Sequence, residues 1–208
     1  MHWVAASSRA GRPWVVANDE QGSWAYGVPP DPGYQGFDGT VPDPRRRYNL
    51  HDIRKLTLWG NLMAGGAGVE YYFGYKLPQQ DIDAEDFRSR DRSWDFCRYA
   101  LEFFRNEKIP FWDMVSADAL VGNTVSGESA YCLAKPNDVY LVYLPWGGVP
   151  TIDLRATTGD FALRWFNPRT GGALVEGAVM SVRGGSRVRL GEPPADAAED
   201  WLAVLRRK

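Results

Sequence analysis

The segment Ala64–Tyr75, Ala-Gly-Gly-Ala-Gly-Val-Glu-Tyr-Tyr-Phe-Gly-Tyr, constrains the fold of this chain more than any other. It is apolar, dense in glycine and follows a helical pattern, so we predict a buried parallel strand. Gly65, Gly66 and Gly68 weaken a strand interior, and their presence indicates that another backbone or a ligand approaches closely. Glu70 interrupts the apolar run. Its burial is costly unless the carboxylate takes part in chemistry or forms a structural ion pair with an arginine.

Composition and charge argue against several classes of protein. The chain has 208 residues, 44% of them hydrophobic, which is enough for one large domain or two small ones. Its formal net charge is −2 and it has no basic stripe, so we expect no nucleic-acid partner. The two histidines, His2 and His51, and the two cysteines, Cys97 and Cys132, lack metal-ligand spacing. We therefore expect no metal and no cofactor, and carboxylates must carry any acid–base chemistry.

The sequence has no segment that predicts membrane insertion or export. No apolar run approaches the roughly 20 residues that span a bilayer, and the first residues lack the charged and then apolar pattern of a signal peptide. The chain as given is expected to stay where it is made, and its oligomeric state is not predicted.

A strand followed by a polar cluster is predicted near the start of the chain. The apolar run Trp14–Ala17 leads into Asn18–Gln21, which is typical of a parallel strand whose carboxyl end opens on a site. A solvated loop is the alternative interpretation of this cluster. Residues 22–47 are rich in Gly, Pro and Asp, and aromatic side chains such as Trp24 indicate an ordered loop that faces a ligand.

Two helices are predicted in the first half of the chain. Asn49, followed three residues later by Asp52, predicts a helix start, and apolar residues recur at helical spacing up to Met63. This helix joins the Trp14 strand to Ala64–Tyr75, so we expect a right-handed βαβ unit with parallel strands. A second helix is predicted over 91–106, and Pro110 ends it.

The second half has the pattern of an antiparallel β-sandwich. Short strand-like runs are separated by turn signals about every ten residues, and Lys135–Asp138 has the residues of a hairpin turn. The predicted strands are Ala130–Ala134, Val139–Tyr143, Thr151–Leu154, Phe161–Phe166, Ala173–Glu176, Val179–Val182, Arg187–Leu190 and Trp201–Leu205. We place one domain at 1–112 and the second at 113–208, an α/β plus all-β organisation.

Several of these motifs resemble a known family. Residues 11–21 and 62–75 resemble the apiosidase-like glycoside hydrolases of bacteria, and Tyr140–Pro145 and Trp165–Gly171 resemble the small β domain, named for collagen binding, that follows their barrel. The resemblance implies that 1–112 are the last two βα units of a (β/α)8 barrel and that the β-sandwich comes next. It implies a C-terminal part of a longer enzyme, because family members have a complete barrel of roughly 250 residues.

The resemblance also implies roles for individual residues. Glu20 matches the catalytic nucleophile, while the acid/base carboxylate of the family lies on a strand that this chain does not contain. Glu70 is a possible second carboxylate, and we expect rather that it positions sugar hydroxyls together with Tyr71 or Tyr72. Asn18 and Trp24 complete the expected carbohydrate-binding residues. The phase of the Ala64–Tyr75 strand, and hence which tyrosine faces the ligand, is left open.

Three functions are compatible with this sequence. The first is a glycoside hydrolase fragment acting on plant or bacterial polysaccharide side chains, without turnover by itself. The second is a non-catalytic β-sandwich that binds carbohydrate or collagen, and the third is a β domain that only supports the barrel. An exposed row of aromatic side chains, for instance with Trp146, would favour binding. If the chain belongs to a full-length family member, secretion or a periplasmic location is expected.

Overall fold

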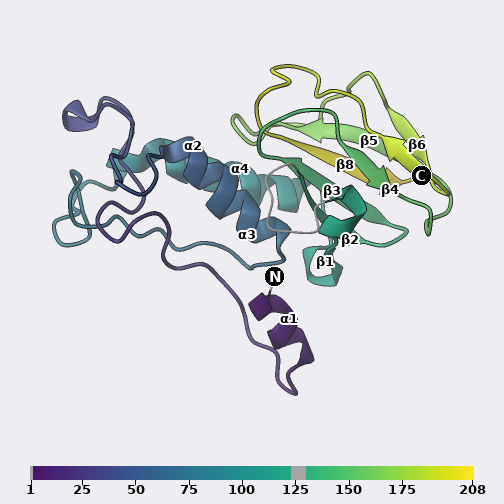
Figure 1. Cartoon of the computed structure of the whole chain (residues 1–208), viewed down its shortest axis with the longest axis horizontal. Helices are drawn as coiled ribbons and strands as arrows, with labels where there is room; N and C mark the ends of the chain where they lie inside the picture. Colours follow the sequence, from purple (N-terminus) through teal and green to yellow (C-terminus); the bar gives the residue numbers. More distant parts are fainter. Residues whose placement is uncertain (1, 123–129) are drawn as a thin grey trace. The chain divides into compact units, whose positions relative to one another are not determined.

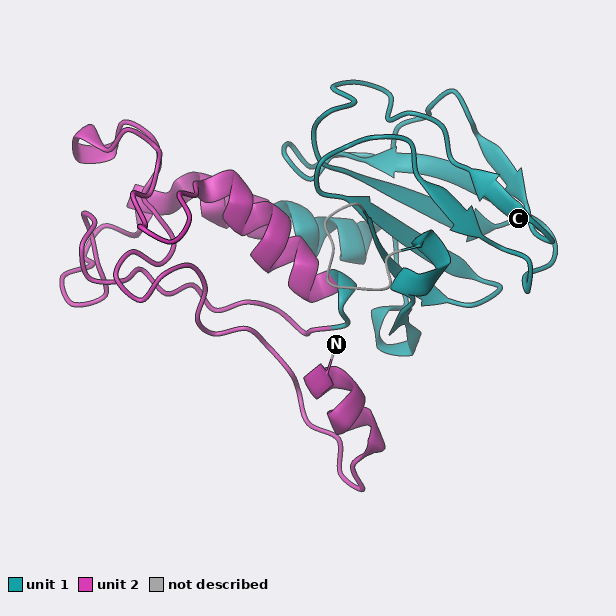
Figure 2. Ribbon diagram, viewed as in Figure 1, with its two compact units in different colours: residues 1, 63–65, 99–208 teal, residues 2–62, 66–98 magenta. Residues whose placement is uncertain are grey.

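The computed structural model describes residues 2–122 and 130–208. Within them the chain separates into two compact units (Figure 2). Unit 1 contains residues 63–65 and 99–208, and unit 2 contains residues 2–62 and 66–98. The helix predicted over 91–106 is confirmed as α4 (Asp91–Asn106). The boundary between the two units falls inside this helix.

Unit 1 is built from antiparallel sheet. Its strands are β1 (Val115–Ser116), β2 (Tyr131–Lys135), β3 (Val139–Leu144), β4 (Thr151–Asp153), β5 (Asp160–Phe166), β6 (Ser181–Arg183), β7 (Arg187–Arg189) and β8 (Trp201–Arg207). Six of them form one sheet in the order β1-β2-β3-β8-β5-β6, while β4 and β7 pair separately (Figure 1). Short 3-10 turns lie at Phe111–Asp113 and Asp118–Val121.

The core of unit 1 draws side chains from both sheets. Ile152 of β4 belongs to the same buried cluster as Tyr140 and Val142 of β3 and Leu205 of β8. All six residues of β3 are buried, so this strand is apolar without alternation because both of its faces are covered. On the face of the sheet that carries Phe166, the Phe103 ring of α4 lies 4.6 Å away, centroid to centroid.

Seven of the eight predicted strands are confirmed within one or two residues. The predicted turn between β2 and β3 is also confirmed, with Asn137 at a positive φ of 65°. The prediction of a strand over Ala173–Glu176 is wrong, because only an isolated bridge joins Val175 to Trp165 there. Glycines lie on both sides of this bridge. Gly172, before it, has a positive φ of 92°, and Gly177, after it, has no side chain where the Trp165 indole packs.

Unit 2 contains one long helical segment besides the first half of α4. It runs through α2 (Leu50–Asp52), the π-helical stretch η2 (Ile53–Trp59) and α3 (Gly60–Met63), whose last residue belongs to unit 1. The predicted start is confirmed, since Asn49 and Asp52 form a capping box. A short helix, α1 (His2–Arg9), precedes the Trp14 segment. The remaining 3-10 turns are Tyr34–Gly36 and Phe87–Arg90.

The predicted parallel strands are reduced to a single bridge. Asn18 pairs with Val69 in parallel, and the backbone bonds from Ala67 N to Val16 O (2.8 Å) and from Glu70 N to Asn18 O (2.8 Å) extend the contact. The direction expected for the βαβ unit is therefore correct. The prediction that Ala64–Tyr75 is a buried strand is wrong, because most of this segment is half-buried or exposed. Parallel strands are buried when neighbours and helices cover both faces. Here, besides the local bonds to Asn61 and Asp81, the backbone bonds of this segment go to two short stretches, residues 16–18 and 25–28.

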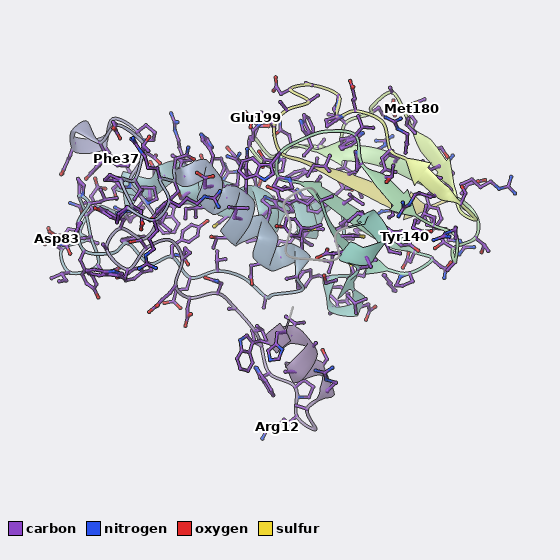
Figure 3. All side chains as sticks on the ribbon, viewed as in Figure 1. Arg12, Phe37, Asp83, Tyr140, Met180 and Glu199 are labelled. Atoms are coloured by element: carbon purple, nitrogen blue, oxygen red, sulfur yellow. The ribbon has the colours of Figure 1, made fainter. Side chains whose placement is uncertain are left out.

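The loops of unit 2 are ordered around a small core of their own. Residues 22–47 form the predicted loop, in which Val28 and Val41 are fully buried and cluster with Tyr48 and Ile53. The loops that carry Phe37 and Asp83 lie at the same end of this unit (Figure 3). The buried Arg90 side chain connects these two loops, because its guanidinium donates to the carbonyls of Val28 (3.1 Å) and Pro78 (3.1 Å).

Candidate carbohydrate site

The predicted site residues Asn18, Glu20 and Glu70 come from two paired segments of unit 2. The backbone N–H of Asn18 donates to the Gly68 carbonyl (3.1 Å), and the backbone N–H of Glu70 donates to the Asn18 carbonyl (2.8 Å). These backbone bonds hold Asn18 and Glu70 beside each other. Glu20 follows two residues after Asn18, and the side chains of all three are exposed. Two carboxylates and an amide are thus available to a ligand at the ends of these segments.

Tyr72 lies within electrostatic reach of Glu20. Partial burial, the hydrogen bond and charge of Tyr75, and then the negative charges of Asp81 and Glu20 raise the pKa of Tyr72 to about 12. The Tyr72 hydroxyl stays protonated at neutral pH and donates to the Trp24 carbonyl. This bond ties the Trp24 loop to the segment that carries Glu70.

Tyr71 contacts α4. Its hydroxyl accepts a hydrogen bond from Cys97 Sγ (3.3 Å), and its ring lies 5.5 Å from the Trp94 ring on α4. Burial, with the Cys97 thiol adding to it, raises the pKa of Tyr71. Tyr71 is therefore part of the packing on α4, whereas Tyr72 lies within electrostatic reach of Glu20.

Two exposed aromatic rings belong to the residues that surround Tyr72. Trp24 is 64% exposed and Tyr75 is 47% exposed, and the Tyr75 ring lies edge-on to Tyr72 at 5.9 Å. The Lys76 ammonium lies 5.9 Å from the Trp24 ring centroid and 5.8 Å from that of Tyr26. Flat, partly exposed rings of this kind can stack on the apolar faces of sugar rings.

Sequence reasoning missed Tyr75, Lys76 and Asp81. Simple alternation along an extended segment puts Tyr72 and Tyr75 on opposite faces, but Gly74 has a φ of 74° and breaks the alternation between them. Asp81 stabilises this bend, because its carboxylate accepts hydrogen bonds from the amides of Phe73 (3.1 Å) and Gly74 (3.2 Å). The sequence signal that could have predicted this bend is an acidic residue, Asp81, a few positions after an extended segment that ends at a glycine, Gly74.

Among the described residues, no group of three or more His, Cys, Asp or Glu side chains is placed to hold a metal ion. Nor is any described helix long and apolar enough to cross a membrane.

The Trp165–Gly171 motif of unit 1 forms a turn that is internally bonded. The Asn167 side chain accepts from the Arg169 amide (3.0 Å), and the Gly171 amide donates to the Asn167 carbonyl (2.9 Å). Arg169 then donates to the carbonyl of Asp200 (2.6 Å) and packs over the Trp201 ring at 5.2 Å. These contacts give the motif a structural role in joining the turn to β8.

Most aromatic side chains of unit 1 are buried. Trp146 is 40% exposed and Trp112 is 81% exposed, whereas Trp165, Trp201 and Phe161 are each at most 3% exposed. The described residues of this unit therefore do not present the row of exposed aromatic side chains that would favour polysaccharide binding.

Comparison with known proteins gives two kinds of likeness. Residues 115–206 match the family model described as "Putative collagen-binding domain of a collagenase". The whole chain is similar in fold to a glycoside hydrolase family 5 protein from Bacteroides vulgatus ATCC 8482, with a TM-score of 0.65, 18% identity, and coverage of 99% of this chain and 45% of that one. A second structure, described as a glycoside hydrolase, gives a TM-score of 0.63, 15% identity, and coverage of 100% and 46%.

A search of curated protein sequences gave no match. At these identities the structural likeness establishes the fold alone, and the chain spans less than half the length of both hydrolases. The chain thus combines a segment similar to the collagen-binding-domain family, over 115–206, with a fold similar to part of two glycoside hydrolases.

Proposed function

We propose that this chain forms the C-terminal part of a glycoside hydrolase, with residues 1–112 belonging to its barrel and 113–208 to the β domain that follows. The apiosidase-like family remains the expected subfamily. The observation that carries the proposal is the position of Glu20, an exposed carboxylate two residues after Asn18, which is bridged in parallel to Val69. The likeness of the chain to two glycoside hydrolases supports it.

In this proposal Glu20 is the nucleophile of a retaining mechanism. Its carboxylate attacks the anomeric carbon, the glycosidic C–O bond breaks, and an acid protonates the leaving oxygen. Water then attacks the glycosyl ester with the same acid group acting as base, which releases the sugar and regenerates Glu20. Two carboxylates about 5 to 5.5 Å apart are needed for retention, and the second comes either from Glu70 or from a part of the enzyme outside this chain.

The neighbouring residues position the sugar. Asn18 and Glu70 hydrogen-bond to hydroxyl groups, and Trp24 stacks on the ring while Tyr72 holds the Trp24 backbone in place. The substrate class is a plant or bacterial polysaccharide side chain, which implies that the longer protein works outside the cytoplasm, secreted or periplasmic. No cofactor is required for this chemistry.

The test of the nucleophile is Glu20→Gln in the longer protein that contains this chain. The amide keeps the shape but has no nucleophilic charge, so we expect turnover to fall to the background rate while sugar binding persists. Glu70→Gln is the matched control, with a loss of about 10- to 100-fold if Glu70 only positions hydroxyls by a charge-assisted bond. Wild-type turnover by Glu20→Gln would show that Glu20 is not the nucleophile.

The match of residues 115–206 supports a second candidate, a binding module for collagen or carbohydrate. Here the β domain acts without catalysis and Trp146 supplies the exposed aromatic contact. Co-sedimentation of the 208-residue chain with insoluble collagen and with cellulose tests this candidate. It predicts binding that Trp146→Ala weakens and that Glu20→Gln leaves unchanged, and a chain that stays in the supernatant with both materials contradicts it.

A further inference from the structure

Unit 2 contains a cavity beside the proposed catalytic segment. Its volume is about 280 Å³, and it lies between the start of the long loop, the end of that loop and the helix that follows. This volume is near the lower end of the roughly 300 to 1,000 Å³ found for small-molecule pockets, so it suits a single sugar residue. The cavity begins at Gly22, two residues after Glu20. Two residues of extended chain span at most about 7 Å, so the backbone at the cavity edge lies close to that of Glu20.

The walls of the cavity differ in chemistry. Ile53 and Leu56 supply an apolar surface, while Ser23, Tyr48 and Thr57 supply hydroxyl groups. The Tyr48 hydroxyl is already used, because it donates to the Gly27 carbonyl (2.6 Å) and accepts from the Ser23 amide (3.3 Å). Tyr48 therefore acts as a fixed wall, and an apolar surface opposite polar groups is the usual lining of a small-molecule pocket.

Two arginines at the cavity are free to bind an anion. Arg45 and Arg46 line it and are exposed, and in the part of the chain that the structure describes neither guanidinium forms an ion pair. Arg47 follows them directly but does not line the cavity. Arginine is suited to such a site because its planar donors match the oxygens of a carboxylate or a sulfate.

The acidic residues at the cavity are occupied by the protein itself. The Ser23 hydroxyl and the amides of Arg45 (2.8 Å) and Arg46 bind the Asp43 carboxylate and lower its pKa, with the Arg45 charge as the smallest contribution. Asp52 accepts a hydrogen bond from the Asn49 amide (2.9 Å) in the capping box. The two carboxylates stabilise the local backbone, so the guanidinium groups remain the charged groups that a ligand can reach.

We infer that this cavity binds a sugar residue that carries an oxyanion, either the carboxylate of a uronic acid or a sulfate ester. The inference rests on the proposed function for the direction of the sugar chain, which would pass from Glu20 into the cavity, and it assigns an acidic polysaccharide as the substrate class. Arg45 and Arg46 bind the oxyanion, and Ile53 and Leu56 contact the apolar face of the sugar ring. A neutral sugar lacks the group that the arginines recognise.

The experiment measures direct binding to the 208-residue chain by NMR titration, with D-glucuronic acid, glucose 6-sulfate and D-glucose as probes. We expect one or both acidic sugars to bind at least about 10-fold more tightly than glucose, and the tighter of the two identifies the oxyanion. The double variant Arg45→Gln/Arg46→Gln should remove this preference. Arg47→Gln is the control, since it removes one positive charge from the same exposed run outside the cavity and should change the affinity less than 2-fold.

Three results would overturn the inference: equal affinity for the three sugars, no detectable binding at 10 mM, or equal effects of Arg47→Gln and the double variant. The last of these would indicate general attraction to a basic loop. Both variants replace exposed side chains, and their amide spectra report whether the fold persists. The titration measures binding without turnover. A failure of the oxyanion-binding inference is therefore distinguishable from a failure of the nucleophile assignment, which the Glu20→Gln variant tests. Loss of the nucleophile assignment leaves this binding result unchanged.

Discussion

At the scale of single residues, two adjacent tyrosines have different surroundings. Tyr71 packs on α4 through Trp94 and Cys97, and Tyr72 lies on the side of Glu20 and binds the Trp24 carbonyl. Alternation along an extended segment requires that neighbours face opposite sides. The alternation could be predicted from the sequence, but its phase depends on which face α4 covers.

A pair of matched substitutions tests this difference. In the longer enzyme proposed above, Tyr72→Phe removes the hydrogen bond that holds the Trp24 loop, and a bond of this kind contributes about 0.5 to 1.5 kcal/mol. We therefore expect kcat/KM to fall about 2- to 10-fold. Tyr71→Phe removes only the contact with Cys97 and should leave kcat/KM unchanged. The opposite ranking of the two variants would place the ligand on the α4 side of the segment.

At the scale of elements, glycines allow two backbones of unit 2 to touch. A Cβ on Gly27 would lie 2.2 Å from Tyr72 O, and a Cβ on Gly74 would lie 2.6 Å from the backbone of Tyr26. From the sequence, such close approaches are predicted at Gly65, Gly66 and Gly68 instead. A Cβ on Gly66 would clash with the Asn61 side chain rather than with another backbone, and a Cβ on Gly68 would meet nothing within 4 Å.

Gly74→Ala measures the importance of this contact. The substitution adds the strain of a positive φ (74°) and a clash with the Tyr26 backbone. Gly36→Ala is the control, since Gly36 has a similar φ of 80° but open space around it. We expect Gly74→Ala to lower the free energy of unfolding of unit 2 by about 1 to 3 kcal/mol more than Gly36→Ala. Urea titration followed by tryptophan fluorescence gives both values, and equal losses would show that the approach is not tight.

Arg169 is the corresponding anchor among the elements of unit 1. Arg169→Lys removes the planar guanidinium that donates to the Asp200 carbonyl and packs over Trp201, so we expect a loss of about 1.5 to 3 kcal/mol in unfolding free energy. Arg164→Lys is the matched control. Its partner Glu176 is exposed and their contact is 3.2 Å, and a surface pair of this kind contributes about 0 to 1 kcal/mol. Chemical denaturation of the two variants should therefore give clearly different midpoints, and similar midpoints would remove the structural role of the Trp165–Gly171 motif.

At the scale of the whole molecule, the N-terminal part of unit 2 exposes apolar side chains. Trp3 is 65% exposed, Trp14 51% and Val15 78%, and the segment is bonded to residues 67–70 through Val16 and Asn18. A net charge of −2 gives little electrostatic repulsion between copies. Exposed apolar segments with an extended backbone pair readily with other chains.

We therefore expect the 208-residue chain to self-associate at micromolar concentration. Val15→Lys places a charge on the extended segment and should shift the light-scattering mass towards the monomer. Val149→Lys adds the same charge to an exposed valine of unit 1 (36% exposed) and should leave the mass unchanged. A monodisperse wild-type monomer would contradict the prediction.

Local signals in the sequence determined the helices, the hairpin turn and most of the strands of unit 1. Asn49 and Asp52 complete a capping box within one turn, the apolar period of 91–106 is a property of one helix, and Lys135–Asp138 closes its turn within four residues. Only the tertiary structure decided that Ala64–Tyr75 is a half-exposed segment with one parallel bridge, that Tyr72 rather than Tyr71 lies near Glu20, and that Arg45 and Arg46 line a cavity. The physical reason is range: caps and turns are bonded between neighbours along the chain, whereas burial, facing and cavities depend on which distant segments cover a residue.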